Sequence, residues 1–489
     1  MSGMFDDFKE QVRSQANIVE IISEYVPLKK RGGSFWGCCP FHGEKTPSFS
    51  VTPDKNFFYC YGCHVGGDVF TFVMKMENCT FPEALKLLAN KLGIAVPEKE
   101  KTKAELEREK QAKQVIAANE LATRFFQACL TKTDYGIKAQ EYLTGRGITP
   151  EIIERFSIGV ALPNYNALLS ALGKRGCSAG LLVQAGLAVN YDRGPMDKFR
   201  GRVMIPIQDP RGHVVGFGGR ILEQNSQQMA KYMNTGETEW FNKRTLLFGM
   251  NVALKEIKKR RQAVIVEGYM DAISLHAAGI DWAVASMGTA FAQEQAKLLA
   301  RAADEVVFSY DSDAAGQRAT VRAVSIAKEA GLKVRVLIVP DGKDPDEFVR
   351  KHGKDAYLRL IETAVSGIEF QMQYVISQNN VSNLAGKVEA VSNILPFLLE
   401  CKNEIEVAQH IKTLAQRLTI DEGLIMSEYR KLSRKNDRRE AVSKWQVQPN
   451  VLSAEDLAEQ LLLYVILKNT DLALVYRDKI DSVGFMSKF

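Results

Sequence analysis

Cysteine and histidine form two closely spaced pairs near the N-terminus. The pairs are Cys39 with His42 and Cys60 with Cys63, each with two residues between its members. Thiolate and imidazole are preferred zinc ligands, and four of them fill a tetrahedral site without leaving a position for a catalytic water. The spacing therefore predicts one structural Zn²⁺. Free cysteines in a small apolar core are the less specific alternative.

Lysines alternate with aromatic side chains around these pairs: Lys45, Phe49, Lys55, Phe57, Phe58, Tyr59 and Tyr61. This combination is typical of proteins that follow a phosphate backbone and stack on the bases of a single strand. For Phe49 and Phe57 a second interpretation is equally open, because strand aromatics also cover thin cores. Cys38 and His64 lie beside the ligand pairs but fit their spacing less well.

Acidic residues follow three predicted apolar strands in the middle of the chain. Strand 263–266 precedes one group, strand 306–310 the second, and strand 334–339 the third; the acids are Glu267, Asp271, Asp311, Asp313, Asp344 and Asp346. Sites in open parallel sheets form beyond the carboxyl ends of the strands. Clustered carboxylates favour magnesium or manganese, which leave positions for substrate phosphates. The pattern predicts a site for nucleotide chemistry.

Each acidic group also has a purely structural interpretation. Asp311-Ser312-Asp313 could cap a helix that starts at Ala314, and Asp344-Pro345-Asp346 could form a turn. Proline also biases Asp344 toward an extended backbone. Three acidic strand ends in one domain favour the metal site over three unrelated caps.

The chain is predicted to be a multidomain α/β protein. Its N-terminal part is a zinc ribbon, its centre a mixed α/β core with a largely parallel sheet, and its C-terminal part helical. The predicted segments are a zinc-binding domain at 1–97, a charged linker at 98–113, a basic part of the core at 114–249, the acidic sheet domain at 250–365, a helical subdomain at 366–432, a basic linker at 433–450 and a further helical start at 451–489.

Composition sets limits on the partners. The 489 residues carry a net charge of +6, which permits nucleic acid as a partner without proving it. No apolar run reaches the roughly 18 residues that a membrane span needs, and the N-terminus does not resemble a signal peptide. We therefore expect a cytoplasmic protein with no membrane partner.

The sequence resembles the bacterial replicative primases, the DnaG-type DNA primases, over about residues 1–430. The resemblance rests on CPFHGEKTPSF at 39–49 with Cys60 and Cys63, KFRGR at 198–202, GFGGR at 216–220, KYMN at 231–234, VEGYMD at 266–271 and PDGKDPD at 340–346. The glycines within 216–219 would by themselves be weak evidence for the resemblance, because glycines also suit a β-bulge. The acidic domain is similar to the Toprim fold of topoisomerases and some nucleases.

The resemblance implies an enzyme that makes short RNA primers from ribonucleoside triphosphates on single-stranded DNA. It implies that Glu267, Asp311 and Asp313 are catalytic and that the six acids hold Mg²⁺ or Mn²⁺. It also implies a template and nucleotide surface made by Arg146, Arg200, Arg202, Arg220, Lys231, Tyr232, Asn234 and Lys243. Expected partners are the replicative helicase and single-strand binding protein, with action at the replication fork in the nucleoid. A solvated basic face is the alternative for each cation.

Two positions depart from the family pattern. Ser312 stands where the family usually has glycine, which is harmless only if this residue does not need a positive φ. Helices resembling a helicase-binding domain begin near Ala454, but Phe489 comes about a hundred residues early by family expectation. We therefore expect weak helicase binding, which a pull-down beside a full-length relative would test.

Two other functions compete with primer synthesis. A topoisomerase or nuclease would share the acids, but a topoisomerase needs a tyrosine nucleophile in a further domain and would form a covalent DNA adduct. A zinc-dependent single-strand binding or regulatory protein would bind DNA in a salt-dependent way and incorporate no nucleotides.

Overall fold

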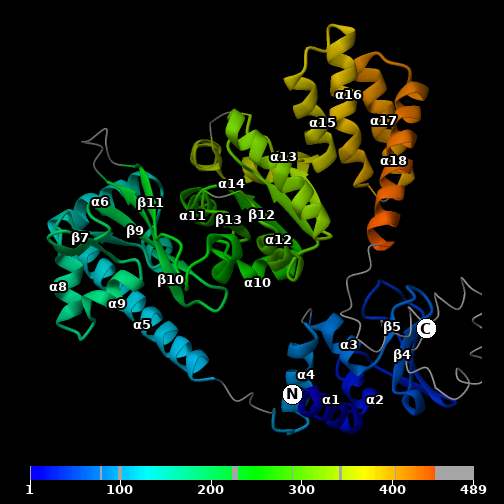
Figure 1. Cartoon of the computed structure of the whole chain (residues 1–489), viewed down its shortest axis with the longest axis horizontal. Helices are drawn as coiled ribbons and strands as arrows, with labels where there is room; N and C mark the ends of the chain where they lie inside the picture. Colours follow the sequence, from blue (N-terminus) through cyan, green and yellow to red (C-terminus); the bar gives the residue numbers. More distant parts are fainter. Residues whose placement is uncertain are drawn as a thin grey trace, which may run out of the picture. The chain divides into compact units, whose positions relative to one another are not determined.

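The computed structural model describes residues 2–77, 80–96, 102–222, 230–288, 290–340, 344–401 and 403–445. It divides into two compact units, Met1–Tyr374 and Val375–Phe489, and each is described by itself below (Figure 1). The predicted segment 451–489 and the last part of the predicted linker, 446–450, lie outside the described residues.

The N-terminal module combines a five-stranded sheet with four helices. The sheet has the order β1-β2-β3-β4-β5, and all of its pairs are antiparallel. Its elements are α1 (Ser2–Gln15), α2 (Ile18–Ser23), β1 (Lys29–Arg31), β2 (Ser34–Gly37), β3 (Phe49–Thr52), η1 (Pro53–Lys55), β4 (Phe57–Cys60), β5 (Gly66–Gly67), α3 (Val69–Met76) and α4 (Phe81–Lys91). The short η1 turn joins β3 to β4, so the predicted hairpin lies between the two ligand pairs.

The basic part of the core is an antiparallel sheet packed against a 30-residue helix. The sheet order is β11-β10-β9-β6, with a separate β7-β8 hairpin. The elements are α5 (Lys103–Lys132), α6 (Asp134–Gly145), α7 (Pro150–Arg155), β6 (Gly159–Ala161), α8 (Ala167–Gly173), α9 (Ala179–Gln184), β7 (Ala188–Tyr191), β8 (Gly194–Asp197), β9 (Arg202–Gln208), β10 (Val214–Ile221), β11 (Tyr232–Asn234) and η2 (Lys243–Thr245). Phe126 of α5 meets Phe217 of β10 with ring centroids 5.5 Å apart.

Part of the predicted linker at 98–113 is helical. Residues 103–113 form the start of α5, where Thr102 and Glu105 make a capping box. Alternating Glu, Lys and Arg are good helix formers, and the capping box satisfies the first free N–H groups. Arg108 pairs with Glu239 at 2.6 Å and lies over the ring of Trp240, so this stretch contacts the core.

The acidic domain is built on a mainly parallel sheet with the order β13-β12-β14-β15-β16. Only the β15-β16 pair is antiparallel. Its elements are α10 (Met250–Arg260), β12 (Gln262–Val266), α11 (Tyr269–Ala277), β13 (Ala283–Ala285), α12 (Gln293–Ala300), β14 (Glu305–Phe308), α13 (Ala314–Glu329), β15 (Lys333–Val336), α14 (Pro345–Thr363) and β16 (Val365–Ser366). Strand β12 is buried from Ala263 to Val266, as expected for a central parallel strand.

The remaining helices are α15 (Gly367–Gln378), α16 (Leu384–Leu399), α17 (Glu404–Leu418) and α18 (Glu422–Trp445). In the second unit, α16 and α17 both pack on α18. Helix α18 continues through residues 433–445 of the predicted linker, because Lys, Arg and Glu sustain a helix well; the linker itself stays a prediction. In the part of the chain that the structure describes, no helix is both long and apolar enough to span a membrane.

Candidate functional site

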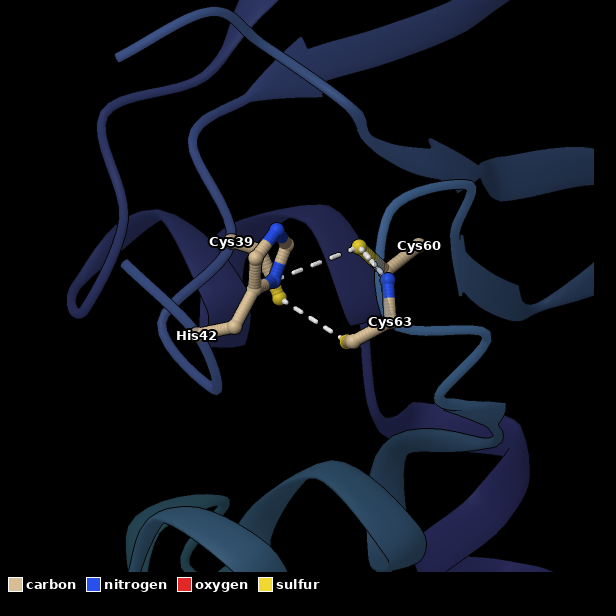
Figure 2. Close-up of side chains that lie close together, drawn as sticks. All are labelled: Cys39, His42, Cys60 and Cys63. Carbon is tan, nitrogen blue, oxygen red and sulfur yellow. Dashed lines mark hydrogen bonds between the residues drawn. The ribbon is translucent and has the colours of Figure 1, made fainter. Parts of the chain in front are cut away.

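The four predicted zinc ligands converge in the N-terminal module. One ligand atom from each of Cys39, His42, Cys60 and Cys63 lies within 4.8 Å of the others (Figure 2). The Cys39 and Cys63 sulfurs are 3.8 Å apart, and Nδ1 of His42 lies 3.8 Å from the Cys60 sulfur. This donor set and spacing fit one zinc ion, which would be held by all four side chains.

Backbone N–H groups support the sulfur atoms. The Cys60 sulfur accepts from the N–H groups of Gly62 and Cys63 at 3.3 and 3.4 Å. Burial acts to raise the pKa of Cys60, but these bonds and that from Ser48 outweigh it, and the pKa falls to about 7. At Cys39 burial prevails and raises the pKa to about 12. The hydrogen bonds to the Cys60 sulfur therefore favour its thiolate form, which is the form that ligates zinc.

The two neighbouring candidates stay outside this quartet. Cys38 is exposed. His64 has a φ of 59°, and its Nδ1 is 3.0 Å from the Tyr59 hydroxyl oxygen. Gly62 is needed beside His42, since a Cβ at this position would lie 2.6 Å from the imidazole Nε2.

Glu44 is a further member of this site that the sequence analysis missed. Its Oε2 lies 3.2 Å from Nε2 of His42, and its Oε1 accepts from the Cys39 N–H at 2.6 Å. Ser48 donates its hydroxyl to Oε2 at 2.5 Å, and this bond is the main cause that lowers the pKa of Glu44. An acid two residues after a ligand histidine was the available signal.

The aromatic residues around the quartet divide into two groups. Phe49 and Phe58 are fully buried and stack at 5.3 Å, so they belong to the core. Phe57 is 42% exposed and Tyr61 is 61% exposed. Tyr61 also stacks on Trp36, with centroids 5.7 Å apart and planes 10° apart. The open alternatives for Phe49 and Phe57 therefore resolve differently.

The acids of the sheet domain gather at neighbouring strand ends. Strands β12 and β14 run parallel and pair up to Ile265 and Phe308, so Glu267 and the 311–313 segment leave the same edge. Burial and repulsion from Glu267 and other acids raise the pKa of Asp311 to about 6. Burial and Asp313 raise the pKa of Glu267. The carboxylates thus repel one another in one region of clustered negative charge.

Asp271 belongs to the same group. It lies in the first turn of α11, and burial, followed by repulsion from Asp344, Asp311 and Asp346, raises its pKa well above the usual range. Among the described residues, the zinc quartet is the group of three or more ligand side chains whose ligand atoms all lie within 4.8 Å of one another; the acids make no such group. Excess negative charge at strand ends fits oxygen-ligated divalent cations.

The predicted cap at 311–313 is confirmed, whereas the alternative of a turn at 344–346 is wrong, because this segment starts helix α14. Asp313 caps α13 by accepting from the Gly316 N–H at 2.7 Å, and Asp344 caps α14 by accepting from the Glu347 N–H at 2.7 Å. The backbone of Asp344 is extended, with φ −144° and ψ 164°, as the following proline predicts. Ser312 is not among the residues with positive φ, so its position does not demand glycine.

Asp346 differs from the other predicted metal ligands. Its side chain is 2% exposed and pairs with Arg146 at 2.8 Å and with Arg350 at 2.9 Å. Ser274 donates its hydroxyl to the same carboxylate at 2.5 Å. Of the six predicted acids, Asp346 is thus one whose charge is balanced by direct ion pairs with cations of the protein.

Several predicted basic residues form a stacked group with tyrosines. The guanidinium of Arg220 lies 5.3 Å from the ring centre of Tyr142 and 5.1 Å from that of Tyr232, whose hydroxyl accepts its hydrogen bond. Arg146 lies over the same Tyr142 ring at 5.7 Å. Lys231 is exposed and is one of the groups that act to lower the pKa of Asp311. Tyr142 was missed by the sequence analysis.

The remaining predicted positions lie in different surroundings. Arg200 stacks on Tyr165 at 4.9 Å and donates to the Asp197 carbonyl. Lys243 is half-buried in η2 and contributes to lowering the pKa of Lys198, after burial. Asn234 ends β11, and its side-chain oxygen is buried without a hydrogen-bond partner among the described atoms.

Arg202 corrects one prediction. Only 1% of the residue is exposed, and its guanidinium donates to the carbonyls of Gly219, Ala230 and Lys231. It therefore braces the backbone between β10 and β11 and does not belong to an open nucleotide surface. A Cβ at Gly219 would lie 3.0 Å from Cδ of Arg202, so that glycine makes room for it.

Four family models match consecutive parts of the chain. They are the CHC2 zinc finger at residues 4–104, the N-terminal domain of the DNA primase catalytic core at 125–254, a Toprim-like domain at 264–349 and the DnaB-helicase binding domain of primase at 368–423. The DNA primase of Clostridium acetobutylicum is 39% identical over 481 residues, which cover 98% of this chain and 79% of that protein. The chain belongs to the DNA primase family.

Other relatives agree with this assignment. The DNA primase of Halalkalibacterium halodurans is 34% identical, with 96% of this chain and 80% of that protein covered. The crystal structure of the zinc-binding and RNA polymerase domains of the Aquifex aeolicus primase is 31% identical, with a TM-score of 0.54, and covers 86% of this chain and 99% of that one. A structure of a DnaG primase catalytic domain bound to single-stranded DNA has 34% sequence identity and a TM-score of 0.57. The match covers 64% of this chain and 99% of that one.

Family membership defines the activity. The chain is a DNA-directed RNA polymerase that synthesises RNA primers in replication, and its quartet is that of a zinc ribbon with a structural zinc ion. The match at 368–423 supports a replicative helicase as a partner. It falls on the segment that the sequence predicted only as a helical subdomain, whereas the helicase-binding start predicted at 451 lies outside the described residues.

Proposed function

We propose that Glu267, Asp271, Asp311, Asp313 and Asp344 hold one or two Mg²⁺ or Mn²⁺ ions for nucleotidyl transfer. The observation that carries this is the clustering of carboxylates at the ends of β12 and β14, where burial and then repulsion among the acids raise the pKa of Asp311 to about 6. Bound divalent ions would activate a primer 3′-hydroxyl and stabilise the departing pyrophosphate. The acids would orient the ions at one edge of a rigid sheet.

The basic face beside these acids would bind the template and the ribonucleoside triphosphates. Its proposed members are Arg146, Arg200, Arg220, Lys231, Tyr232, Asn234 and Lys243. Stacking of Arg220 between two tyrosines holds its guanidinium in one orientation, which suits bidentate binding of phosphate. Lys231 stands close enough to the acids to influence Asp311, so a triphosphate could contact both groups of side chains.

The zinc module would read the single-stranded template. In the stacked pair of Trp36 and Tyr61, Tyr61 is exposed and Trp36 is half-buried, and Lys45 and Lys55 are exposed on the same small domain. Aromatic platforms with nearby cations bind single strands through stacking and phosphate contacts. At the replication fork in the nucleoid the template is covered by single-strand binding protein, which we propose as a functional partner beside the helicase.

Incorporation of labelled ribonucleotides on single-stranded DNA tests the acidic site. We expect short RNA products from the parent with magnesium or manganese, and loss of at least about 100-fold in rate for Glu267→Gln, because electrostatic groups at a reacting centre have effects of this size. Glu294→Gln changes an exposed acid on α12 and should retain the parent rate. A parent-like rate for Glu267→Gln would remove Glu267 from the metal site.

A further inference from the structure

Every hydrogen-bonding position of the Asp346 carboxylate is already used by the protein. Oδ1 accepts from the Ser274 hydroxyl at 2.5 Å and from Arg350 Nε at 2.9 Å. Oδ2 pairs with Arg146 Nη2 at 2.8 Å and accepts from Arg350 Nη2 at 3.2 Å. An ionised carboxylate has about four lone-pair sites. No oxygen lone pair of Asp346 therefore remains for a metal ion.

The charge of Asp346 is already balanced by cations of the protein. Two guanidinium groups pair directly with this carboxylate, which is 2% exposed, while the acid Asp271 interacts with it by charge repulsion. In contrast, no hydrogen bond or ion pair from the described residues reaches the side chain of Asp311, and the acids Glu267, Asp344 and Asp313 act on it more strongly than the cation Lys231. A divalent ion would gain more from the acids near Asp311 than from Asp346.

The same ion pair fixes Arg146. Arg146 is the C-cap residue of α6 in the basic part of the core, whereas Asp346 lies in the first turn of α14 in the sheet domain. The guanidinium of Arg146 lies 5.7 Å from the ring centre of Tyr142, and the Arg146 side chain is 19% exposed. Arg146 is thus held from two directions while part of it stays accessible, as a preorganised phosphate contact should be.

We propose that Asp346 is a positioning residue for Arg146 and not a metal ligand. It locks the guanidinium across the junction of the two halves of the core, where Arg146 binds a phosphate group of the incoming ribonucleotide or of the template. The phosphate contact rests on the proposed basic face, whereas the ion pair is present in the structure itself.

Manganese binding separates a ligand from a positioning residue. In the zinc-loaded full chain, Mn²⁺ affinity is measured by electron paramagnetic resonance for Asp346→Asn, Asp311→Asn and Asp355→Asn, the last an exposed acid on the same helix. We expect Asp346→Asn to stay within about twofold of the parent and Asp311→Asn to lose at least about tenfold, the effect of one charged contact. A loss at Asp346→Asn equal to that at Asp311→Asn overturns the proposal.

A double-mutant cycle provides a second readout that does not depend on the metal. Asp346→Asn and Arg146→Gln should each raise KM for ribonucleotides or Kd for single-stranded DNA by about tenfold, and the pair together should do no more. A change in KM alone identifies the nucleotide phosphate, and a change in Kd alone identifies the template. Additive effects, or no effect on either constant, overturn the proposal.

Two outcomes need their own controls. If Asp311→Asn retains Mn²⁺, the proposed metal site fails, and the double-mutant cycle still decides the role of Asp346. If Asp346→Asn does not fold, Arg350→Gln removes two of its bonds while keeping the carboxylate. It should then leave Mn²⁺ affinity within about twofold of the parent value, and a change of about tenfold in either direction contradicts the proposal.

Discussion

Glu44 and Cys60 lie beside different nitrogens of the His42 imidazole. Its Oε2 lies 3.2 Å from Nε2, whereas Nδ1 of the same ring lies 3.8 Å from the Cys60 sulfur. The ring is therefore oriented with Nδ1 toward the metal position, and a proton on Nε2 would be shared with the carboxylate. Carboxylates placed in this way fix the tautomer of a ligand histidine and raise its basicity.

Replacing Glu44 with glutamine should weaken zinc binding by about 10- to 100-fold, the range seen when such supporting groups are removed. Chelator competition on the full chain would measure this. Asp54→Asn is the matched control, since Asp54 is an exposed acid in the η1 turn of the same module. Equal zinc affinity in both variants would contradict a role for Glu44 at the site.

Asp311→Asn should stabilise the zinc-loaded protein in the absence of added magnesium or manganese, and only at higher pH. Folding raises the pKa of Asp311 in the parent from 3.8 to about 6, so the folded state favours the protonated carboxyl group. The parent therefore loses stability as pH rises from about 4 through 6, and the full loss is reached above pH 6. The variant should gain about 1–3 kcal/mol at pH 8, and the gain should vanish as pH falls toward 4. Denaturant unfolding at several pH values would show this.

The same titration predicts how metal binding depends on pH. Mn²⁺ should bind the parent tightly at pH values above 6. Its affinity should fall progressively below pH 6, because protons compete with the metal for Asp311. Stability that is equal for variant and parent at pH 8, or metal affinity that stays constant from pH 8 to pH 5, would contradict the proposed charge cluster.

Gly218→Ala should destabilise the core by about 1–3 kcal/mol, the usual cost of overpacking. A Cβ on Gly218 would lie 2.7 Å from Cε1 of Tyr269, a residue only 4% exposed that cannot easily move aside. Gly173→Ala is the control, because its Cβ would meet nothing within 4 Å. Thermal unfolding would compare the two, and equal midpoints would show that Tyr269 can shift without cost.

Substitutions of Arg202 and Lys231 should affect different properties, stability in the first case and DNA binding in the second. Arg202→Met removes a buried guanidinium that three carbonyls share, and should cost about 2–4 kcal/mol of stability. Lys231→Ala changes an exposed cation, and should lower the salt dependence of single-strand binding by about one unit while preserving stability. A reduced salt dependence in a stable Arg202→Met protein would return Arg202 to the DNA surface.

The sequence by itself determined the features that depend on local spacing. Two ligand pairs on either side of a hairpin predict a metal site, because the zinc geometry needs only these four side chains and one turn. Acids at the ends of apolar strands predict a charged sheet edge, because parallel strands end together. The parallel sheet, the helical region 366–432 and the resemblance to primases all followed from such patterns.

Only the tertiary structure decided the role of side chains that depend on distant partners. Phe49 and Phe57 are both aromatic strand residues, yet packing buries one and leaves the other 42% exposed. Arg202 and Arg220 are both arginines in family motifs, yet only the first points into the carbonyls between β10 and β11. Asp346 is neutralised by Arg146, which lies two hundred residues earlier in the chain. Burial and ion pairing are set by contacts between segments, and no local pattern contains them.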